Sequence, residues 1–164
     1  MISMFIIIGL MKPVTTRFGF LVNEVGRLYS QQFDRLAREK LGLSQAQCRL
    51  LGVLALHEGD EPLSQTELAQ RIGVTPMAVA GMCDRMAAAG WIERRPHPED
   101  RRVNWLHIKP SARRALERAM AIGDDLTAQA LASLSATERT QLVNLLGKAR
   151  AGLLALSGAA EESA

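Results

Sequence analysis

The sequence is poor in the residues that build disulfide frameworks, metal sites and catalytic centres. Its 164 residues include two cysteines, three histidines and only 4% aromatic residues. Two cysteines far apart in sequence form no disulfide framework, so a reducing cytoplasm is the expected location. No set of His, Cys, Asp and Glu has the spacing of metal ligands, and no nucleophile–base set or glycine-rich phosphate loop stands out. We therefore expect no metal, no cofactor and no enzymatic activity.

Long hydrophobic runs are also missing. The apolar run of residues 2–11 is too short to cross a bilayer, which takes ~20 such residues. No basic residue precedes it and no small-residue cleavage site follows it, which argues against a signal peptide. We expect no membrane association, and interpret residues 1–14 as an N-terminal extension that packs on a partner subunit or as a start codon assigned too early. A membrane tether is the alternative, and it rests on this run alone.

The chain is instead rich in hydrophobic residues, which make up 48% of the sequence and often stand at helical spacing. Their recurrence at every third or fourth position predicts a mainly α fold. Ser44, Ser64 and Ser135 each stand three residues before a Gln or Glu, the pattern of a capping box at a helix start. The predicted helices cover residues 15–41, 44–57, 64–72, 75–89, 110–132 and 135–156. The expected inner side of the helix over 110–132 consists of Leu116, Met120, Leu126 and Ala130.

The helices over 64–72 and 75–89 form the most specific pattern. Gly73 breaks the first helix, and Thr75 supplies an N-cap for the second. Pro76 follows at the first helical position, where no N–H is needed. Two short helices joined by a tight turn that contains glycine form a helix-turn-helix.

A basic hairpin is expected directly after these helices. Strand-like runs cover residues 91–92 and 103–108, and two prolines in the tip between them exclude a regular ladder there. Residues 85–114 carry eight Lys and Arg against three Asp and Glu, whereas the rest of the chain has twelve against fourteen. A helix-turn-helix followed by a hairpin is a winged helix, and positive charge focused on it is the electrostatic footprint of a DNA-binding surface.

Five motifs occur here in a characteristic order and spacing. They are the Ser64 capping box, Gly73-Val74-Thr75, Asp84-Arg85-Met86, Gly90-Trp91-Ile92-Glu93-Arg94 and Asp100-Arg101-Arg102. Together they resemble the MarR family of bacterial winged-helix regulators, and the SlyA-like members most. The resemblance extends over residues 15–156 in architecture and is specific over 64–108. It implies a dimeric, sequence-specific DNA-binding regulator of transcription, most often a repressor, which a small aromatic or amphipathic ligand releases from DNA.

DNA contacts are expected from the second helix of the helix-turn-helix and from the wing. Arg101 and Arg102 at the wing tip suit phosphate and minor-groove contacts, since a narrow minor groove concentrates negative potential. Asp84 and Asp100 are expected to orient the wing and its arginines. The helix has few side chains for bidentate base contacts, which favours contacts to thymine methyls. The residues expected to contact DNA are Ser64, Thr75, Pro76, Met77, Ala80, Gly81, Arg85, Arg95, Arg101 and Arg102.

The terminal helices carry more apolar surface than one small winged-helix core needs. A homodimer held by residues 15–43 and 110–156 accounts for this surface, and its two-fold symmetry matches a pseudo-palindromic operator. Residues 44–109 are then the winged helix-turn-helix region that binds DNA. Residues 157–164 are small and acidic, and we expect a disordered tail there.

The resemblance also implies a ligand pocket between the dimer helices and the winged helix. A protein-interaction module without an operator of its own is an alternative function, but the basic wing favours DNA. A thiol-based redox sensor through Cys48 or Cys83 is another, although free cysteines are usually small buried hydrophobes. The candidate pocket residues, which are equally compatible with plain core, are Phe18, Val22, Leu50, Leu54 and Met120.

Overall fold

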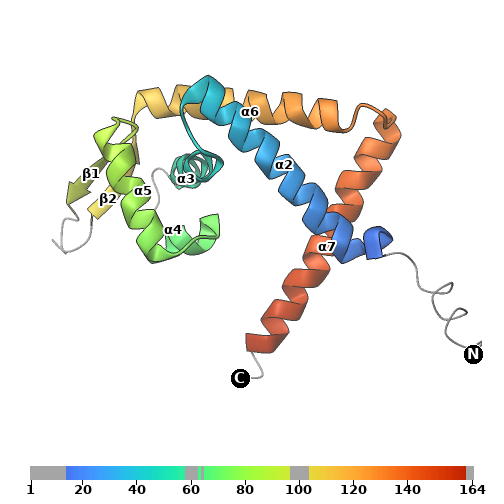
Figure 1. Ribbon diagram of the computed structural model, residues 1–164. Helices are drawn as coiled ribbons and strands as arrows, with labels where there is room; N and C mark the ends of the chain where they lie inside the picture. The colour runs from blue at the N-terminus through green and yellow to red at the C-terminus, as the bar shows by residue number, and fades with distance from the viewer. Residues whose placement is uncertain (1–13, 58–62, 64, 97–103, 162–164) are drawn as a thin grey trace, which may run out of the picture. The chain divides into compact units, whose positions relative to one another are not determined.

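The computed structural model describes residues 14–57, 63, 65–96 and 104–161. Its described part is mainly helical with a two-stranded antiparallel hairpin, as predicted (Figure 1). The chain divides into two compact units, Met1–Asp124 and Asp125–Ala164, and each is described by itself. The elements are η1 (Val14–Thr16), α2 (Phe18–Leu41), α3 (Gln45–Leu56), α4 (Gln65–Ile72), α5 (Pro76–Ala88), β1 (Ile92–Pro96), β2 (Asn104–Ile108), α6 (Pro110–Ala130) and α7 (Ala136–Glu161).

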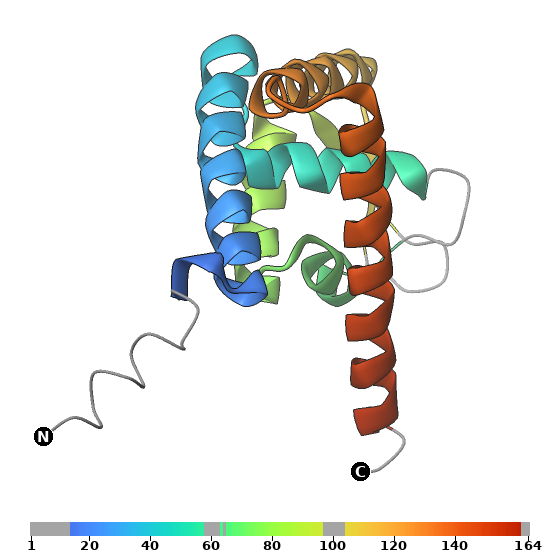
Figure 2. The ribbon, with the colours of Figure 1, turned by 90° about the vertical axis from the view of Figure 1, so that its right-hand side faces the viewer.

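A short turn joins α2 to α3, which runs across it (Figure 2). Gly42 has a φ of 68°, a left-handed conformation that favours glycine, and its N–H donates to the carbonyl oxygen of Arg38 at 3.0 Å. Ser44 then caps α3. Its Oγ accepts from the N–H of Gln47 at 3.3 Å, and the Gln47 side chain accepts from the N–H of Ser44 at 2.8 Å. The capping box predicted at this position is therefore confirmed.

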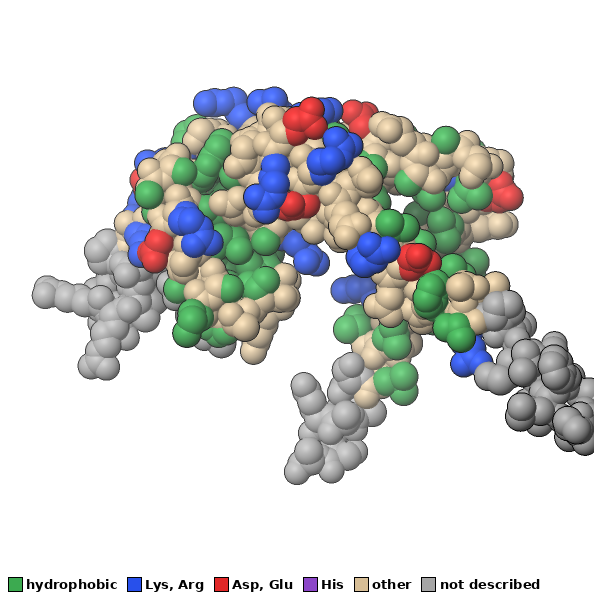
Figure 3. Space-filling model, viewed as in Figure 1, with side chains coloured by type: hydrophobic (Ala, Val, Ile, Leu, Met, Phe, Trp, Pro, Cys, Tyr) green, Lys and Arg blue, Asp and Glu red, His purple; other side chains and the backbone are tan. Residues whose placement is uncertain are grey.

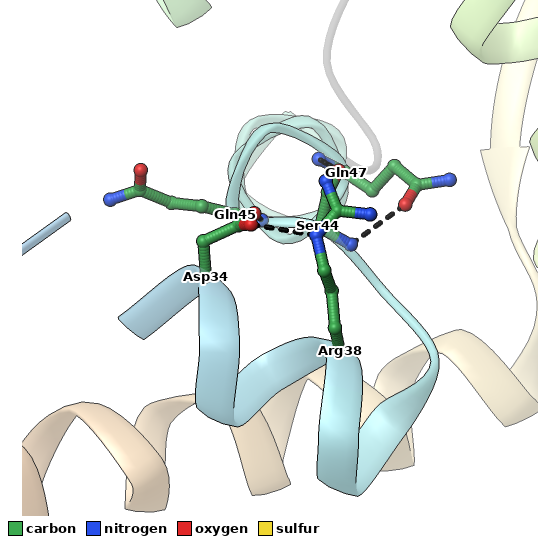
Figure 4. A network of polar contacts seen from close by, with 5 residues as sticks. All are labelled: Asp34, Arg38, Ser44, Gln45 and Gln47. Carbon is green, nitrogen blue, oxygen red and sulfur yellow. Dashed lines mark hydrogen bonds and ion pairs between the residues drawn. The ribbon is translucent and has the colours of Figure 1, made fainter. Parts of the chain in front are cut away.

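Asp34 of α2 holds the same junction from the side (Figure 4). One of its carboxylate oxygens accepts from the N–H of Gln45 at 2.8 Å, and the other accepts from Nε of Arg38 at 2.6 Å. The Arg38 hydrogen bond, followed by that of Gln45, lowers the pKa of this carboxyl below its ordinary value. A carboxylate at the N-terminus of α3 also interacts favourably with the helix dipole. The geometry of the α2–α3 junction thus depends on one charged side chain.

The core of the first unit lies among α3, α4, α5 and the hairpin. Burying one large apolar side chain in such a core contributes about 1.5–3 kcal/mol. The predicted packing of Leu68 and Ile72 against Val79, Met82 and Met86 is confirmed, since all five are buried in one cluster. The largest fully buried side chains are Leu43, Leu50, Leu51, Leu68, Ile72, Val79, Cys83, Met86 and Ile92.

The inner side of α6 differs from the one predicted. Met120 is 64% exposed, Ala130 is exposed, and Leu116 and Leu126 are only half-buried. The buried face is instead built mainly of alanine: Ala112, Ala115, Ala119 and Ile122. The prediction followed the large side chains, whereas alanine buries little surface but lets a helix backbone approach the core closely. Small residues therefore decide which side of α6 faces inward.

The hairpin also differs from the predicted one, because β1 is longer than residues 91–92. It continues to Pro96, and the register pairs Ile92 with Ile108 and Pro96 with Asn104. The charged residues at 93–95 break the apolar alternation from which the strand was predicted, but a strand whose outer face is exposed needs no apolar side chains on that face. Proline is tolerated at the last position of a strand that lies at the edge of its sheet.

Two of the long helices leave apolar side chains uncovered. On α2 these include Phe18, Leu21, Val22, Val25 and Leu28, all more than 40% exposed. On α7, in the second unit, Leu145, Leu146, Leu153 and Leu156 are exposed too. That helix begins with the predicted capping box, in which Glu138 accepts from the N–H of Ser135 at 2.8 Å. It continues to Glu161, five residues into the segment 157–164 for which a disordered tail is expected. No described helix is long and apolar enough to cross a membrane.

The junction at Asp34 makes a pH-dependent prediction. Asp34→Ala should lower the free energy of unfolding by about 1 kcal/mol at pH 7, because the N–H of Gln45 loses its acceptor. A carboxyl with a lowered pKa stabilises the fold above its ordinary pKa of about 3.9, and this contribution is lost as the pH falls through the lowered pKa. The difference between wild type and variant, measured by urea unfolding, should hold from pH 7 to 5 and shrink below about pH 4.

The matched control is Asp34→Asn, which keeps an oxygen acceptor for Gln45 and removes only the charge. It should lose less stability than the alanine variant, and its loss should also fade in acid. Equal stability of all three proteins at pH 7 would contradict the role of Asp34 at this junction.

Candidate nucleic-acid interface

The helix-turn-helix is formed by α4, α5 and the turn between them. Gly73 ends α4 with a φ of 73°, and its N–H donates to the carbonyl oxygen of Gln70 at 3.3 Å. The N–H of Val74 donates to the carbonyl oxygen of Ala69 at 3.0 Å, which completes a Schellman motif. The turn leads directly into Thr75, so the direction of α5 is set by the way α4 ends.

The first turn of α5 is capped and exposed. Oγ1 of Thr75 accepts from the N–H of Ala78 at 3.2 Å, and Pro76 occupies the first helical position, both as predicted. Met77 is 85% exposed, while Ala80 and Gly81 are half-buried. Figure 3 shows hydrophobic side chains gathered where α4 and α5 meet. The opposite face of α5, formed by Val79, Met82, Cys83 and Met86, lies in the core.

The base of the wing is joined to the helices on both sides. Gly90 has a φ of 76°, and the N–H of Trp91 donates to the carbonyl oxygen of Met86 at 2.9 Å, so α5 also ends in a Schellman motif. The carbonyl oxygen of Trp91 accepts from the N–H of Lys109 at 3.0 Å, just before α6. Ser111 of α6 donates its hydroxyl to the carbonyl oxygen of Gly90 at 3.2 Å. These bonds fix where the hairpin leaves the body of the winged helix.

An ion pair connects α5 to the wing. Oδ1 of Asp84 on α5 lies 2.7 Å from Nη2 of Arg94 on β1. The expected orienting role of Asp84 stays a prediction, and Arg94, its partner in the structure, is a residue that the sequence analysis missed. Asp84 and Arg94 stand on either side of the Gly90 turn, and their opposite charges were the feature of the sequence that could have predicted the ion pair. Because both side chains are partly exposed, the pair contributes at most about 1 kcal/mol to stability.

The remaining predicted contact residues are placed unevenly. Arg85 is exposed on α5, and Arg95 lies on β1, where its Nε donates to Oε1 of Glu93 at 2.6 Å. Arg95 thus shares its charge with a carboxylate of the same strand. The other predicted residues of the wing tip and of the α4 start lie outside the described residues: Ser64, Asp100, Arg101 and Arg102.

Both thiols are buried and poorly suited to redox chemistry. Cys83 is fully buried and Cys48 is 6% exposed. Desolvation by burial raises the pKa of Cys48 to about 11, and burial also raises the pKa of Cys83 although the charge of Arg94 opposes it. The thiolate, which is the reactive form, is therefore scarce at neutral pH. Among the described residues, no group of three or more His, Cys, Asp and Glu side chains could hold a metal ion.

A cavity of about 270 Å³ that is open to solvent on one side lies in the first unit between α2, α3 and α6. Of the predicted pocket residues only Met120 lines it. Leu50 and Leu54 are buried in the core, while Phe18 and Val22 are exposed on α2 and are not among its lining residues. The prediction had followed apolar spacing, which does not distinguish a filled core from a void. The lining residues are Tyr29, Phe33, Gln45, Cys48, Arg49, Leu116, Ala119, Met120 and Gly123.

Known proteins share both the sequence pattern and the fold. A sequence model of the MarR family matches residues 41–103. The multiple antibiotic resistance protein MarR of Escherichia coli (strain K12) is 30% identical over 142 residues, which cover 84% of this chain and 98% of that protein. Its crystal structure superposes with a TM-score of 0.71 at 24% identity, covering 85% of this chain and 98% of that one.

Two further relatives agree with this match. YdgJ of Bacillus subtilis (strain 168), an HTH-type transcriptional regulator, is 28% identical over 109 residues, which cover 66% of this chain. The chain spans slightly less than two thirds, 65%, of the length of YdgJ. The S. aureus MepR–DNA complex has a TM-score of 0.68 at 21% identity, covering 83% of this chain and 98% of that one.

The resemblance to SlyA-like members within the family stays a prediction. Three findings agree: the chain forms a winged helix, the MarR family model matches the motifs of that winged helix, and a relative is 30% identical over 98% of its own length. This chain belongs to the MarR family.

Proposed function

We propose that this protein regulates transcription by binding double-stranded DNA through α5 and the wing, in the cytoplasm and without enzymatic activity. One observation carries this proposal: α5, whose first turn is exposed, is held next to a basic strand by the Asp84–Arg94 ion pair at 2.7 Å near its C-terminal end. A helix of this kind enters the major groove while a basic wing contacts the backbone or minor groove. MepR, a protein of the same fold, has been solved bound to DNA, which supports the proposal.

The functional form in this proposal is a homodimer on a pseudo-palindromic operator. The exposed apolar side chains of α2 and α7 support it, because monomeric proteins rarely leave large contiguous apolar surfaces in water. A two-fold dimer places two recognition helices about one turn of DNA apart. The operator therefore has the symmetry of the protein.

Control by a small ligand completes the proposal, with the protein acting as a repressor that the ligand releases. The cavity at α2, α3 and α6 is mainly apolar and of a size for a single-ring compound. Arg49 lines it and donates, through a long 3.5 Å contact, to the carbonyl oxygen of Ile72 at the end of α4. A ligand in the cavity would therefore touch a residue that contacts the helix-turn-helix. Binding that differs between two conformations shifts their populations.

The two alternative functions have less support. A protein-interaction module would not require positive charge focused on residues 85–114. Redox sensing through Cys48 or Cys83 would require an accessible thiolate, whereas both thiols are buried and have a raised pKa. The DNA-binding regulator accounts for both observations.

The wing provides the direct test of DNA binding. Arg101→Ala combined with Arg102→Ala should weaken binding to a duplex selected from a random library by about 1–3 kcal/mol, because two guanidinium groups that bind phosphates and the minor groove are removed. The slope of log affinity against log salt should flatten by about 0.9 for each phosphate that the variant leaves unneutralised. Fluorescence anisotropy at several salt concentrations measures both quantities.

The matched control for net charge is Arg27→Ala combined with Arg35→Ala, since both arginines lie on α2 and are exposed. It should bind nearly as tightly as wild type. A wing variant with wild-type affinity and salt slope would contradict a role of the wing in DNA binding.

The dimer is tested by its mass. Sedimentation velocity at micromolar concentration should give about twice the 17.9 kDa chain mass. Val25→Glu places a charge in the exposed apolar stripe of α2, where Val25 is 62% exposed, and should shift the protein towards monomer. Gln31→Glu adds the same charge at an exposed polar position of α2 and should leave the dimer intact. A monomeric wild type would overturn the dimer and, with it, the palindromic operator.

The effector is tested at the cavity. In a thermal-shift screen of phenolic and other aromatic compounds, we expect a binder that raises the melting temperature and weakens DNA binding. Met120→Trp, a partly exposed change in the lining, should fill the cavity and abolish this response, while Met120→Leu should retain it. DNA affinity without ligand should be similar in both. If no binder changes the DNA affinity of wild type, ligand control is wrong and DNA binding is unaffected.

A further inference from the structure

Met77, Gly81 and Arg85 form a stripe along α5. Each is four residues from the next, so the three lie on one face of the helix. Side chains on such a face incline towards the N-terminus of the helix. Met77 is 85% exposed, and Arg85 is exposed as well. The stripe thus presents one flexible thioether and one guanidinium on the face that the core leaves free.

Gly81 leaves room between them, and Arg85 occupies that room. A Cβ atom added at Gly81 would lie 3.4 Å from Nη1 of Arg85. The guanidinium is therefore folded back over the glycine, towards Met77. A methyl group at position 81 would only touch the Arg85 guanidinium, but a longer side chain there would displace the guanidinium. No described carboxylate forms an ion pair with Arg85, whereas the neighbouring Asp84 is held by Arg94.

The other side chains at the start of α5 cannot read a base in detail. Oγ1 of Thr75 already accepts a hydrogen bond from the N–H of Ala78. Pro76 and Ala78 carry no side-chain donor or acceptor. In the major groove, an apolar group contacts the 5-methyl of thymine, and a guanidinium donates two hydrogen bonds to O6 and N7 of guanine. Met77 and Arg85 are suited to these two contacts.

We propose that Met77 and Arg85 determine operator specificity together, by reading a thymine methyl and a guanine that lie close together in each half-site. This inference rests on the proposed function and adds the bases that are read. Met77 and Arg85 are eight residues apart, a span of ~12 Å along the helix. The Arg85 guanidinium, however, lies over Gly81, which is only four residues or ~6 Å from Met77. Base pairs follow one another every ~3.4 Å, so the two bases lie within about two base pairs. Gly81 is the positioning residue that allows Arg85 to lie beside Met77.

The experiment uses duplexes selected from a random library with the full-length wild-type protein. In the selected duplex, each thymine is replaced in turn by uracil, which removes only the methyl group, and each guanine by 7-deazaguanine, which removes N7. For wild type we expect one thymine and one guanine per half-site, within about two base pairs, at which affinity falls about fivefold or more. Fluorescence anisotropy at fixed salt measures the affinity.

The variants assign each base to its residue. Met77→Ala should bind the unmodified duplex more weakly than wild type and be insensitive to uracil at the assigned position, while remaining sensitive to 7-deazaguanine. Arg85→Ala should show the reverse pattern, and Arg85→Lys, which keeps the charge without the fork, should resemble it. Gly81→Leu, which leaves Arg85 present but takes its place, should lose sensitivity at the guanine.

Controls separate these effects from general ones. Leu56→Ala removes an apolar side chain that is 79% exposed at the end of α3, and Arg35→Ala removes a charge on α2. Both should respond to every modified base as wild type does. Undiminished sensitivity of Met77→Ala to uracil, or of both Arg85 variants to 7-deazaguanine, would overturn the pairing. A library that yields no enriched duplex would overturn the proposed function itself, and this inference with it.

Discussion

The interface depends on one constraint: α5 must have one face fixed in the core for its other face to be presented in a fixed direction. Val79, Met82, Cys83 and Met86 supply that fixed face, and each is at most 7% exposed. Truncating a buried side chain of this size costs about 2–5 kcal/mol, far more than any surface contact of the interface. The exposed face can therefore vary in sequence without loss of the fold. The exposed face of α5 has few polar groups, and these can differ without unfolding the protein because they contribute little to stability.

The direction of α5 is set by backbone rather than by side chains. Both α4 and α5 end at a glycine with positive φ, Gly73 and Gly90, and both ends satisfy their carbonyl oxygens through Schellman hydrogen bonds. A residue with a Cβ atom would be strained at either position. Asp84 and Arg94 then join the end of α5 to the wing by an ion pair that is too exposed to stabilise the fold much. Structural orientation and thermodynamic stability are thus provided by different groups.

Much of this arrangement could be predicted because local rules decide it. Capping boxes at Ser44 and Ser135 and the Thr75-Pro76 start depend only on neighbouring residues. The inner face of α6 could not be predicted in this way, because its alanines are selected by how closely the helix approaches the core. The lining of the cavity could not be predicted for a related reason. Ala119 and Gly123 leave space opposite Tyr29 and Phe33. The spacing of residues along one helix does not show where volume between helices is unfilled. Arg94 was missed because its partner lies across a turn.

The cavity follows from the same small residues that bring α6 close to the core. A helix that packs through alanine and glycine can approach its neighbours, yet it leaves space where its own side chains are only a hydrogen or a methyl group. Gly123 illustrates this, since its carbonyl oxygen accepts from the Tyr29 hydroxyl at 3.1 Å, and a Cβ added there would lie 3.6 Å from that hydroxyl oxygen and 3.7 Å from Cε2 of Phe33. Filling the gap with larger side chains would add buried surface and stability. A chain that leaves it open gives up that stability, which is the trade-off that the proposed ligand site would require.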